Sequence, residues 1–260
     1  MPNPTSRTRA LPLWLAVLTA LVLSLSSSGC KKHSGNSSAI LESNIGPSSL
    51  ALRGRLIFDS TPTMAHSYTG NLLSCGDCHL ESGTADYAMP MIDVANLFPR
   101  YSQRAGHTIT LVNRIQECFA RSENGVPPPA GSPGMKALVA YIQWLSRAAP
   151  QGQPYESRGL VKLPALTGNP ASGKKLYASR CAGCHGSNGA GMPPSLPPLW
   201  GAGSFSDGAG LNQTAKMAAF VQHNMPQNAP GTLSPQQSYD VAAYLATRPR
   251  PKFDKAYQNY

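Results

Sequence analysis

Apolar residues recur at helical spacing in two parts of the chain that lie about a hundred residues apart. In residues 135–145, the apolar positions 135, 138, 142 and 145 follow the period of an α-helix. Residues 238–245 carry a second amphipathic pattern. Shorter helical patterns stand further upstream in each half, at 52–58 and at 171–179, with Ser172 as a candidate N-cap. The pattern predicts an all-α protein built from two similar units, with few strands.

The N-terminal residues have the anatomy of an export signal. Arg7 and Arg9 precede a 15-residue apolar run, Leu11–Leu25, which ends in small residues before Cys30. The run is shorter than the ~20 residues that a membrane-spanning helix needs. We therefore predict a signal peptide of lipoprotein type at 1–29, acylation of Cys30, and a lipid-anchored protein in the bacterial periplasm. Ordinary cleavage nearby, or a disulfide from Cys30, are the alternatives.

Composition divides the rest of the chain. Residues 30–49 are rich in Ser, Gly and Asn and read as a flexible tether. Residues 150–168 hold several prolines and glycines with little periodicity, which predicts a linker between an N-terminal domain at 50–149 and a C-terminal domain at 169–260. A hydrophobic content of 41% excludes wholesale disorder.

The net charge of +10 is spread along the chain. We find no block of six like charges and no helix face rich in Lys and Arg, so nucleic-acid binding is disfavoured. A basic surface fits a small anionic substrate or an acidic electron-transfer partner.

Four of the six cysteines form two C-x-x-C pairs, and a histidine follows each pair directly. The residues are Cys75, Cys78 and His79 in the first half, and Cys181, Cys184 and His185 in the second. C-x-x-C-H is the attachment signature of c-type haem, in which the two thiols bind the porphyrin and the histidine ligates iron. A redox or zinc C-x-x-C pair is the alternative, and its duplication in an exported chain disfavours it. The motifs predict two covalent haems c, one in each domain.

The sixth ligand of each haem iron bears on function, because axial ligands set the reduction potential of the haem. For the second haem we favour Met225, which lies 40 residues after His185 and before a proline. Met192 and Met217 are competitors, although Met217 falls on a helical apolar run and is more typical of core. His223 is a minor rival.

For the first haem the candidates are Met135 and Cys118. Met135 opens an apolar helix and fits the core. Cys118 has Arg114 and Arg121 at −4 and +3, on one face if the segment is helical. These cations are expected to lower the thiol pKa and so favour the thiolate that ligates iron. A buried structural thiol or a disulfide with Cys30 are the alternatives for Cys118.

Around this cysteine the chain resembles the dihaem thiosulfate dehydrogenases. The matching residues are Tyr101, Arg104, Gly106, Thr110, Arg114, Ile115, Cys118, Phe119, Arg121, Ser122 and Gly125, then Met135 to Leu145, and in the second half Pro197 to Gly201 and Asn224-Met225-Pro226. The resemblance covers roughly residues 45–252. It implies a catalytic haem ligated by His79 and Cys118, and an electron-exit haem ligated by His185 and Met225. Some members place Lys before that methionine, whereas this chain has Asn224.

The resemblance implies that two thiosulfate dianions are coupled to tetrathionate. Cations are needed to bring two dianions together, and Arg114, Arg121 and Arg104 are the candidates, since guanidinium groups suit sulfonate oxygens. The mechanistic hypothesis is that Cys118 leaves the iron transiently and carries a sulfur adduct. Electrons then pass through the second haem to an external acceptor such as a small cytochrome. The physiological direction, oxidation or tetrathionate reduction, stays open.

Two functions other than thiosulfate dehydrogenase are also compatible with the sequence. One is a non-enzymatic dihaem electron carrier, which ligation of the first iron by Met135 would favour. The other is a different sulfur-compound cytochrome that conjugates thiosulfate to a carrier protein, which would need a persulfide on Cys118 and a partner subunit.

Overall fold

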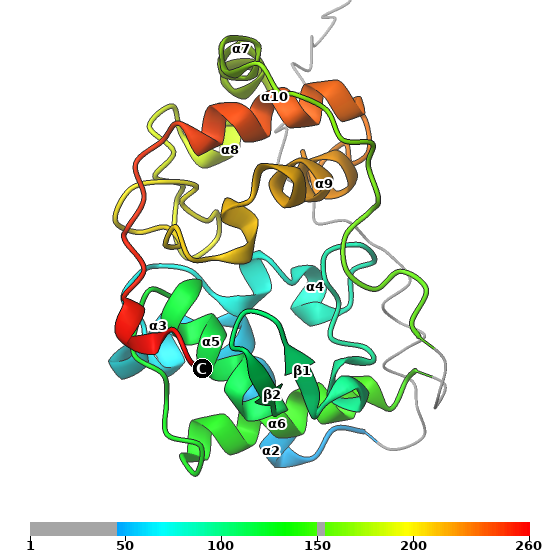
Figure 1. The fold of residues 1–260 in the computed structure, drawn as a ribbon, viewed down its shortest axis with the longest axis vertical. Helices are drawn as coiled ribbons and strands as arrows, with labels where there is room; N and C mark the ends of the chain where they lie inside the picture. Colours follow the sequence, from blue (N-terminus) through cyan, green and yellow to red (C-terminus); the bar gives the residue numbers. More distant parts are fainter. Residues whose placement is uncertain (1–45, 150–153) are drawn as a thin grey trace, which may run out of the picture.

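The computed structural model describes residues 46–149 and 154–260, and its helices fall into two groups along the chain (Figure 1). The first group comprises α2 (Ser49–Asp59), α3 (Thr61–Met64), η1 (His66–Tyr68), η2 (Cys75–Asp77), α4 (Leu80–Gly83), η3 (Val94–Leu97), α5 (Leu111–Arg121) and α6 (Pro133–Ser146). The second comprises α7 (Pro170–Arg180), α8 (Ala182–His185), η4 (Gly210–Asn212), α9 (Thr214–Asn224), α10 (Pro235–Ala246) and η5 (Lys255–Tyr257). The all-α prediction is confirmed.

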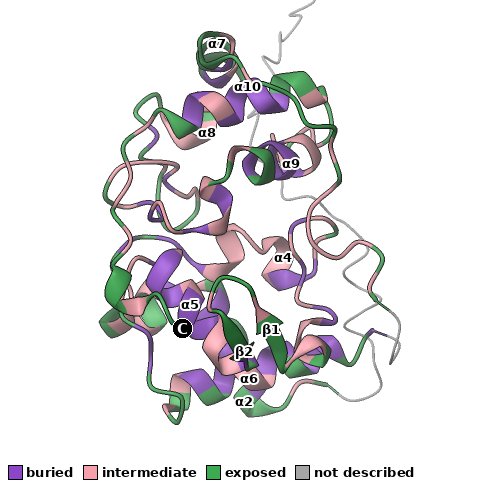
Figure 2. Cartoon of the chain, in the orientation of Figure 1, coloured by how far each residue is buried: buried purple, intermediate pink, exposed green. Residues whose placement is uncertain are grey.

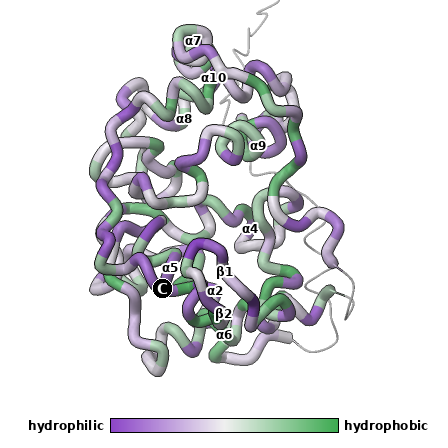
Figure 3. The backbone as a smooth tube through the Cα atoms, in the orientation of Figure 1, coloured by the Kyte–Doolittle hydropathy of each residue, from purple (hydrophilic) through white to green (hydrophobic). Residues whose placement is uncertain are grey.

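Strands are few among the described residues, as predicted. β1 (Arg100–Ser102) and β2 (His107–Ile109) form an antiparallel hairpin that pairs Tyr101 with Thr108. The tip of this hairpin is hydrophilic, whereas α6 is largely hydrophobic (Figure 3). The hairpin leads directly into α5, whose start is capped by the Thr110 hydroxyl accepting from the Asn113 N–H.

In each half the first and last long helices cross at a glycine. A Cβ on Gly54 of α2 would overlap the backbone carbonyl of Ala137 on α6. A Cβ on Gly173 of α7 would overlap the carbonyl of Asp240 on α10. The absence of a side chain lets the two helix backbones approach closely. The same device in both halves supports the inference that the chain contains two copies of one unit.

Each half has its own hydrophobic core (Figure 2). In the first, Phe58 packs edge-on against Tyr141, with ring centroids 5.6 Å apart. In the second, Tyr177 packs against Tyr244 at 5.5 Å. Leu73 and Ala88 come from the first half but belong to the second core cluster. The two halves are therefore packed together and not merely tethered.

The segment between the halves is extended where the structure describes it. No helix forms between Tyr155 and Asn169 within that described stretch, which agrees with its low periodicity. It is tied down, however: the buried carboxylate of Asp93 accepts from the Tyr155 N–H and from Arg158, both at 3.0 Å. The predicted linker therefore lies against the first half.

Helix starts were the least accurate part of the sequence reading. The α7 cap is Asn169, whose side-chain oxygen accepts from the N–H groups of Ala171 and Ser172. Ser172 was predicted to cap this helix and is instead its third residue, because Pro170 occupies the first helical position.

The predicted signal peptide, Cys30 and most of the tether lie outside the described residues, and the domain bounds remain predictions. Within residues 46–149 and 154–260, no helix is long and apolar enough to cross a membrane.

We predict that Gly54→Ala and Gly173→Ala each lower the free energy of unfolding of the holoprotein by about 3 kcal/mol, because the new methyl group forces two helix backbones apart. Denaturant unfolding measures this. Gly134→Ala is the matched control, since its nearest neighbour is Ile57 Cδ1 at 3.7 Å; it should change stability by less than about 1 kcal/mol. Equal effects at all three positions would contradict the close-crossing explanation.

Candidate functional site

The first C-x-x-C-H motif is held by hydrogen bonds to Thr61, the first residue of α3. Thr61 accepts from the Cys75 N–H at 3.2 Å, and the Thr61 N–H donates to the Ser74 hydroxyl at 3.1 Å. Asp77 closes the turn by accepting from the Ser74 N–H at 2.8 Å. The His79 N–H then bonds to the Cys75 carbonyl at 3.0 Å, so the motif forms a single helical turn.

His79 is oriented through one ring nitrogen. Its Nδ1 lies 2.7 Å from the Met89 carbonyl, which fixes the ring and leaves Nε2 as the nitrogen available for a metal. Burial lowers the pKa of His79 to about 4, against the opposing effect of the Met89 bond. The imidazole is therefore neutral at ordinary pH, as an iron ligand must be.

The second motif repeats this geometry. The His185 N–H bonds to the Cys181 carbonyl at 2.9 Å, and His185 Nδ1 lies 3.0 Å from the Pro197 carbonyl. Burial lowers the pKa of His185 as well.

Both motifs fit a covalently attached haem. In each, two cysteines and a histidine lie on one turn, and the histidine donates its Nδ1 hydrogen to a backbone carbonyl. That second bond fixes the tautomer with a free Nε2, which is the arrangement that metal-ligating histidines use.

The structure brings Cys118 to the first motif. It lies on α5, it is a free thiol within the described part of the chain, and its charge interacts electrostatically with Cys75 and Cys78. Cys118 is therefore close enough to the first motif for their charges to interact, and it forms no disulfide among the described residues.

Arg114 lowers the pKa of the Cys118 thiol, as predicted, but the net shift is in the opposite direction. The pKa of the Cys118 thiol is raised, because burial outweighs the lowering by Arg114, and Glu117 and Glu123 add to the rise. The second cation acting on the thiol is Arg104, and Arg121 does not contribute. Helical spacing placed Arg114 and Arg121 near Cys118 but could not foresee how deeply the thiol is buried.

Arg104, Arg114 and Arg121 all converge on one carboxylate, Glu117. Arg114 Nη1 lies 3.1 Å from Glu117 Oε2, while Arg104 Nη1 and Arg121 Nε both lie 3.7 Å from Oε1. The Glu117 side chain is only 3% exposed. Sequence reasoning missed Glu117, although its position beside Cys118 and three residues from Arg114 was a usable signal.

The positive charge in this cluster exceeds the negative charge. Three guanidinium groups face one carboxylate, and Arg121 Nε has no hydrogen-bond partner within residues 46–149 and 154–260. Lys216, at the start of α9 in the second half, is repelled by Arg104 and Arg114, which lowers its pKa together with partial burial. Neither Lys216 nor its approach to the first half was predicted. Such a cluster is suited to bind an anion.

Glu123 is a second buried carboxyl near the cysteines. It is 2% exposed, and burial and Asp77 raise its pKa well above the usual range. It interacts electrostatically with Cys75, Cys78 and Cys118. Sequence analysis had no signal for it, because burial depends on tertiary contacts that local sequence does not report.

The methionine candidates separate by burial. Met135 is 1% exposed and packs in the first core, as its position on α6 suggested. Met217 is 6% exposed in the second core, whereas Met192 is 61% exposed. Met225 ends α9 and is half-buried against the second core. Of the three second-half methionines, only Met225 is partly buried: it packs against the second core without being enclosed by it.

Asn224 stands at the position where some family members have Lys. It is buried, and its side chain is already hydrogen-bonded. Its Nδ2 donates to the Tyr87 carbonyl at 3.2 Å and to the Phe220 carbonyl at 3.1 Å. His223, the minor rival for the second iron, has its ring 4.8 Å from that of Tyr87. Both residues therefore contact the first half of the chain.

Comparisons with known proteins agree with this organisation. The cytochrome c domain of the SoxA/TsdA family matches residues 66–150, and the cytochrome c family matches residues 170–249. A thiosulfate dehydrogenase from Allochromatium vinosum is 39% identical over 215 residues, which is 78% of this chain and 79% of the relative. One from Stutzerimonas stutzeri is 38% identical, covering 78% and 68%.

A solved structure supports the same arrangement. The TsdBA thiosulfate dehydrogenase of Marichromatium purpuratum superposes with a TM-score of 0.71 at 34% identity, covering 76% of this chain. This chain spans 45% of that longer chain.

Two cytochrome c domains, each with its own attachment motif, define a dihaem c-type cytochrome that carries two covalent haems. The chain belongs to the thiosulfate dehydrogenase family. It is accordingly an enzyme of that family, and the reading as a non-enzymatic electron carrier is set aside.

We predict that Glu117→Gln lowers the free energy of unfolding by about 3 kcal/mol, because three arginines then face one another around a buried neutral side chain. Sulfate should restore more stability to this variant than to the wild type, by screening the arginines. Thermal unfolding with and without sulfate measures both effects. Asp59→Asn, at the exposed pair with Arg55, is the control and should change stability by less than about 1 kcal/mol. An unchanged E117Q protein would contradict the role given to this carboxylate.

Proposed function

We propose that this chain couples two thiosulfate dianions to tetrathionate and releases two electrons to an external acceptor. The observation that carries the proposal is Cys118, a free thiol beside the first attachment motif with Arg104 and Arg114 acting on it. Relatives of similar length that match most of this chain are named thiosulfate dehydrogenase.

The cation cluster performs the binding step. Two dianions held about 5 Å apart repel by about 3 kcal/mol even in water, and by more in a partly buried site. Arg104, Arg114 and Arg121 offset this repulsion, since guanidinium groups donate charge-assisted hydrogen bonds to sulfonate oxygens. Lys216 adds a fourth cation from the second half.

Cys118 is the covalent carrier in this proposal. Its thiolate forms an S–S bond to the terminal sulfur of the first thiosulfate, and two electrons leave as that bond forms. The second thiosulfate then attacks the same terminal sulfur, which releases tetrathionate and regenerates the Cys118 thiolate. Charge and atoms balance across both steps, and no further reactant is consumed.

The proposed haem ligands are His79 and Cys118 in the first half, and His185 and Met225 in the second. When bound, the haems supply one-electron acceptors that take up the two electrons. Asn224 is held by Tyr87 and Phe220, so in this proposal it is not an exchangeable ligand beside Met225. Whether tetrathionate reduction also occurs depends on the haem potentials.

The protein's setting is also a proposal. An exported, periplasmic enzyme with a lipid-anchored Cys30 fits the N-terminal sequence, and residues 30–49 would hold it at a distance from the membrane. The electron acceptor is an external carrier such as a small cytochrome.

We predict that Cys118→Ala lowers thiosulfate turnover more than about 100-fold, because the covalent carrier is lost. Ferricyanide-coupled assays of the dihaem protein measure this. Low-temperature EPR should show loss of the narrow low-spin signal of a thiolate-ligated haem while the second haem is unchanged. Full turnover in the variant would exclude Cys118 as carrier.

We predict that Met225→Ala abolishes the near-infrared band of methionine-ligated ferric haem and shifts one haem potential by on the order of 100 mV. Met192→Ala is the matched control, because that side chain is exposed, and it should leave both properties unchanged. If only M192A has the effect, the ligand assignment is wrong.

A further inference from the structure

The last twelve residues of the chain leave the second half and cross onto the first. Figure 1 shows this segment, 249–260, running from the end of α10 along one side of the molecule to end beside α5. Asp207 holds its start: the Asp207 N–H donates to the Pro251 carbonyl at 3.0 Å, and Asp207 Oδ1 accepts from the Phe253 N–H at 2.9 Å. We call residues 249–260 the C-terminal strap.

The strap contacts one residue of the candidate site directly. The guanidinium of Arg121 lies 4.0 Å from the ring centroid of Phe253, which is within the range of a cation–π contact. Arg121 Nη2 also donates to the Gln258 carbonyl at 3.5 Å. Nearby, His107 Nε2 lies 3.1 Å from the Asn259 carbonyl, which joins the strap to the β1–β2 hairpin.

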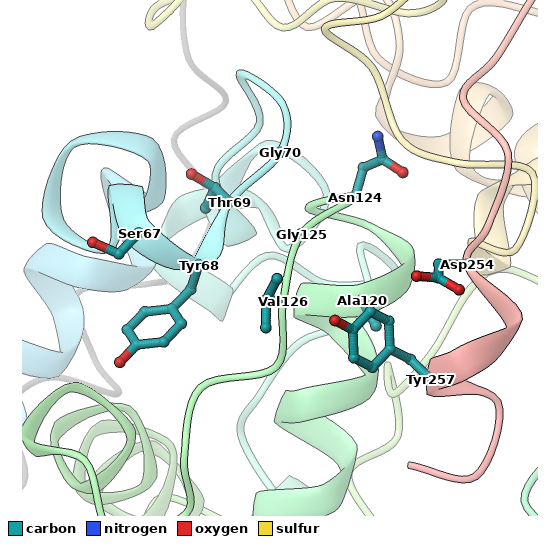
Figure 4. A pocket seen from close by; sticks show the side chains of 10 residues that line it. All are labelled: Ser67, Tyr68, Thr69, Gly70, Ala120, Asn124, Gly125, Val126, Asp254 and Tyr257. Carbon is teal, nitrogen blue, oxygen red and sulfur yellow. The ribbon is translucent and has the colours of Figure 1, made fainter.

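The backbone of Arg121 is held from the second half as well. Its carbonyl accepts from the Ser206 hydroxyl at 2.8 Å and from the Ser206 N–H at 3.2 Å. Figure 4 shows the adjoining cavity of about 300 Å³, in which Asp254 and Tyr257 of the strap face Ala120 and Asn124 at the end of α5. The end of α5 is therefore enclosed by residues far away in sequence.

Together with Glu117, these contacts hold Arg121 on three sides. Phe253 covers one face of the guanidinium and the Gln258 carbonyl takes Nη2, while Nε points to the Glu117 side at 3.7 Å and keeps an unused hydrogen. The side chain is only 9% exposed, so the strap limits the orientations that the guanidinium can take. If the strap no longer restricted the orientation of the guanidinium, the affinity of the site for anions would fall although the charge of Arg121 would be unchanged.

We propose that Phe253 is a positioning residue for substrate binding: by stacking on Arg121, the C-terminal strap holds this guanidinium in the orientation that binds the sulfonate of thiosulfate. The inference rests on the proposed function and adds that the site is completed by the second half of the chain. Phe253 does not touch the reacting sulfur atoms and acts only through Arg121.

The test compares steady-state kinetics of the dihaem protein with Phe253→Leu, Phe253→Tyr and Tyr257→Leu. F253L removes the aromatic ring and keeps an apolar side chain; F253Y keeps the ring. Y257L makes the same kind of change on the same segment. Among residues 46–149 and 154–260, the ring of Tyr257 packs against Tyr260 and against no arginine. We expect F253L to raise KM for thiosulfate about tenfold with kcat within about twofold, F253Y to resemble the wild type, and Y257L to be unchanged.

A double-mutant cycle with Arg121→Lys isolates the coupling. If Phe253 acts through Arg121, F253L should add little to R121K; additive effects would overturn the proposal. It would also be overturned if F253L had wild-type KM, if Y257L matched F253L, or if F253L lowered kcat and left KM unchanged. Phe253→Met replaces F253L if that variant does not accumulate.

Different results would overturn the proposed function and the proposed role of the strap. A wild-type protein that does not oxidise thiosulfate overturns the proposed function and this inference together. A wild-type protein that turns over, combined with an unaltered F253L variant, overturns the role of the strap alone.

Discussion

The candidate site depends on a charge that is buried where water cannot stabilise it. Glu117 is almost inaccessible, and its carboxylate is tolerated because Arg104, Arg114 and Arg121 surround it. The three arginines in turn stay close together only because Glu117 lies between them. One carboxylate cannot neutralise three guanidinium groups, so the cluster keeps a positive charge next to Cys118. The same ion cluster thus shapes the first half and provides its affinity for anions.

Much of the architecture was readable from the sequence, because the signals were local. The C-x-x-C-H motifs each occupy one turn, and helical periodicity located α6 and α10 to within a few residues. Cys118 stood out as an arginine-flanked thiol, and the structure places it beside the first motif. Helix caps were less predictable, as Asn169 in place of Ser172 shows, because several polar residues near a helix start compete for that role.

The rest of the site could not be predicted, because it depends on contacts between distant segments. Lys216 lies about a hundred residues beyond Arg114, and Phe253 more than 130 residues beyond Arg121. The raised pKa of Cys118 has the same origin: sequence spacing counted the nearby arginines, but burial, which sequence spacing does not report, has the larger effect. Glu123 is likewise buried by the tertiary fold, which its sequence position does not indicate.

Because Phe253 lies near the C-terminus, the first domain's site is the last part of the protein to be completed. Synthesis supplies the first attachment motif, α5 and Arg121 long before the strap exists. Until the whole chain has been made, Arg121 lacks both the aromatic ring that covers it and the Gln258 carbonyl that accepts from it. Cys75 and Cys78 therefore precede the strap in the order of synthesis. Under the proposed function, the residues that attach the cofactor are made before the strap that would complete the substrate site.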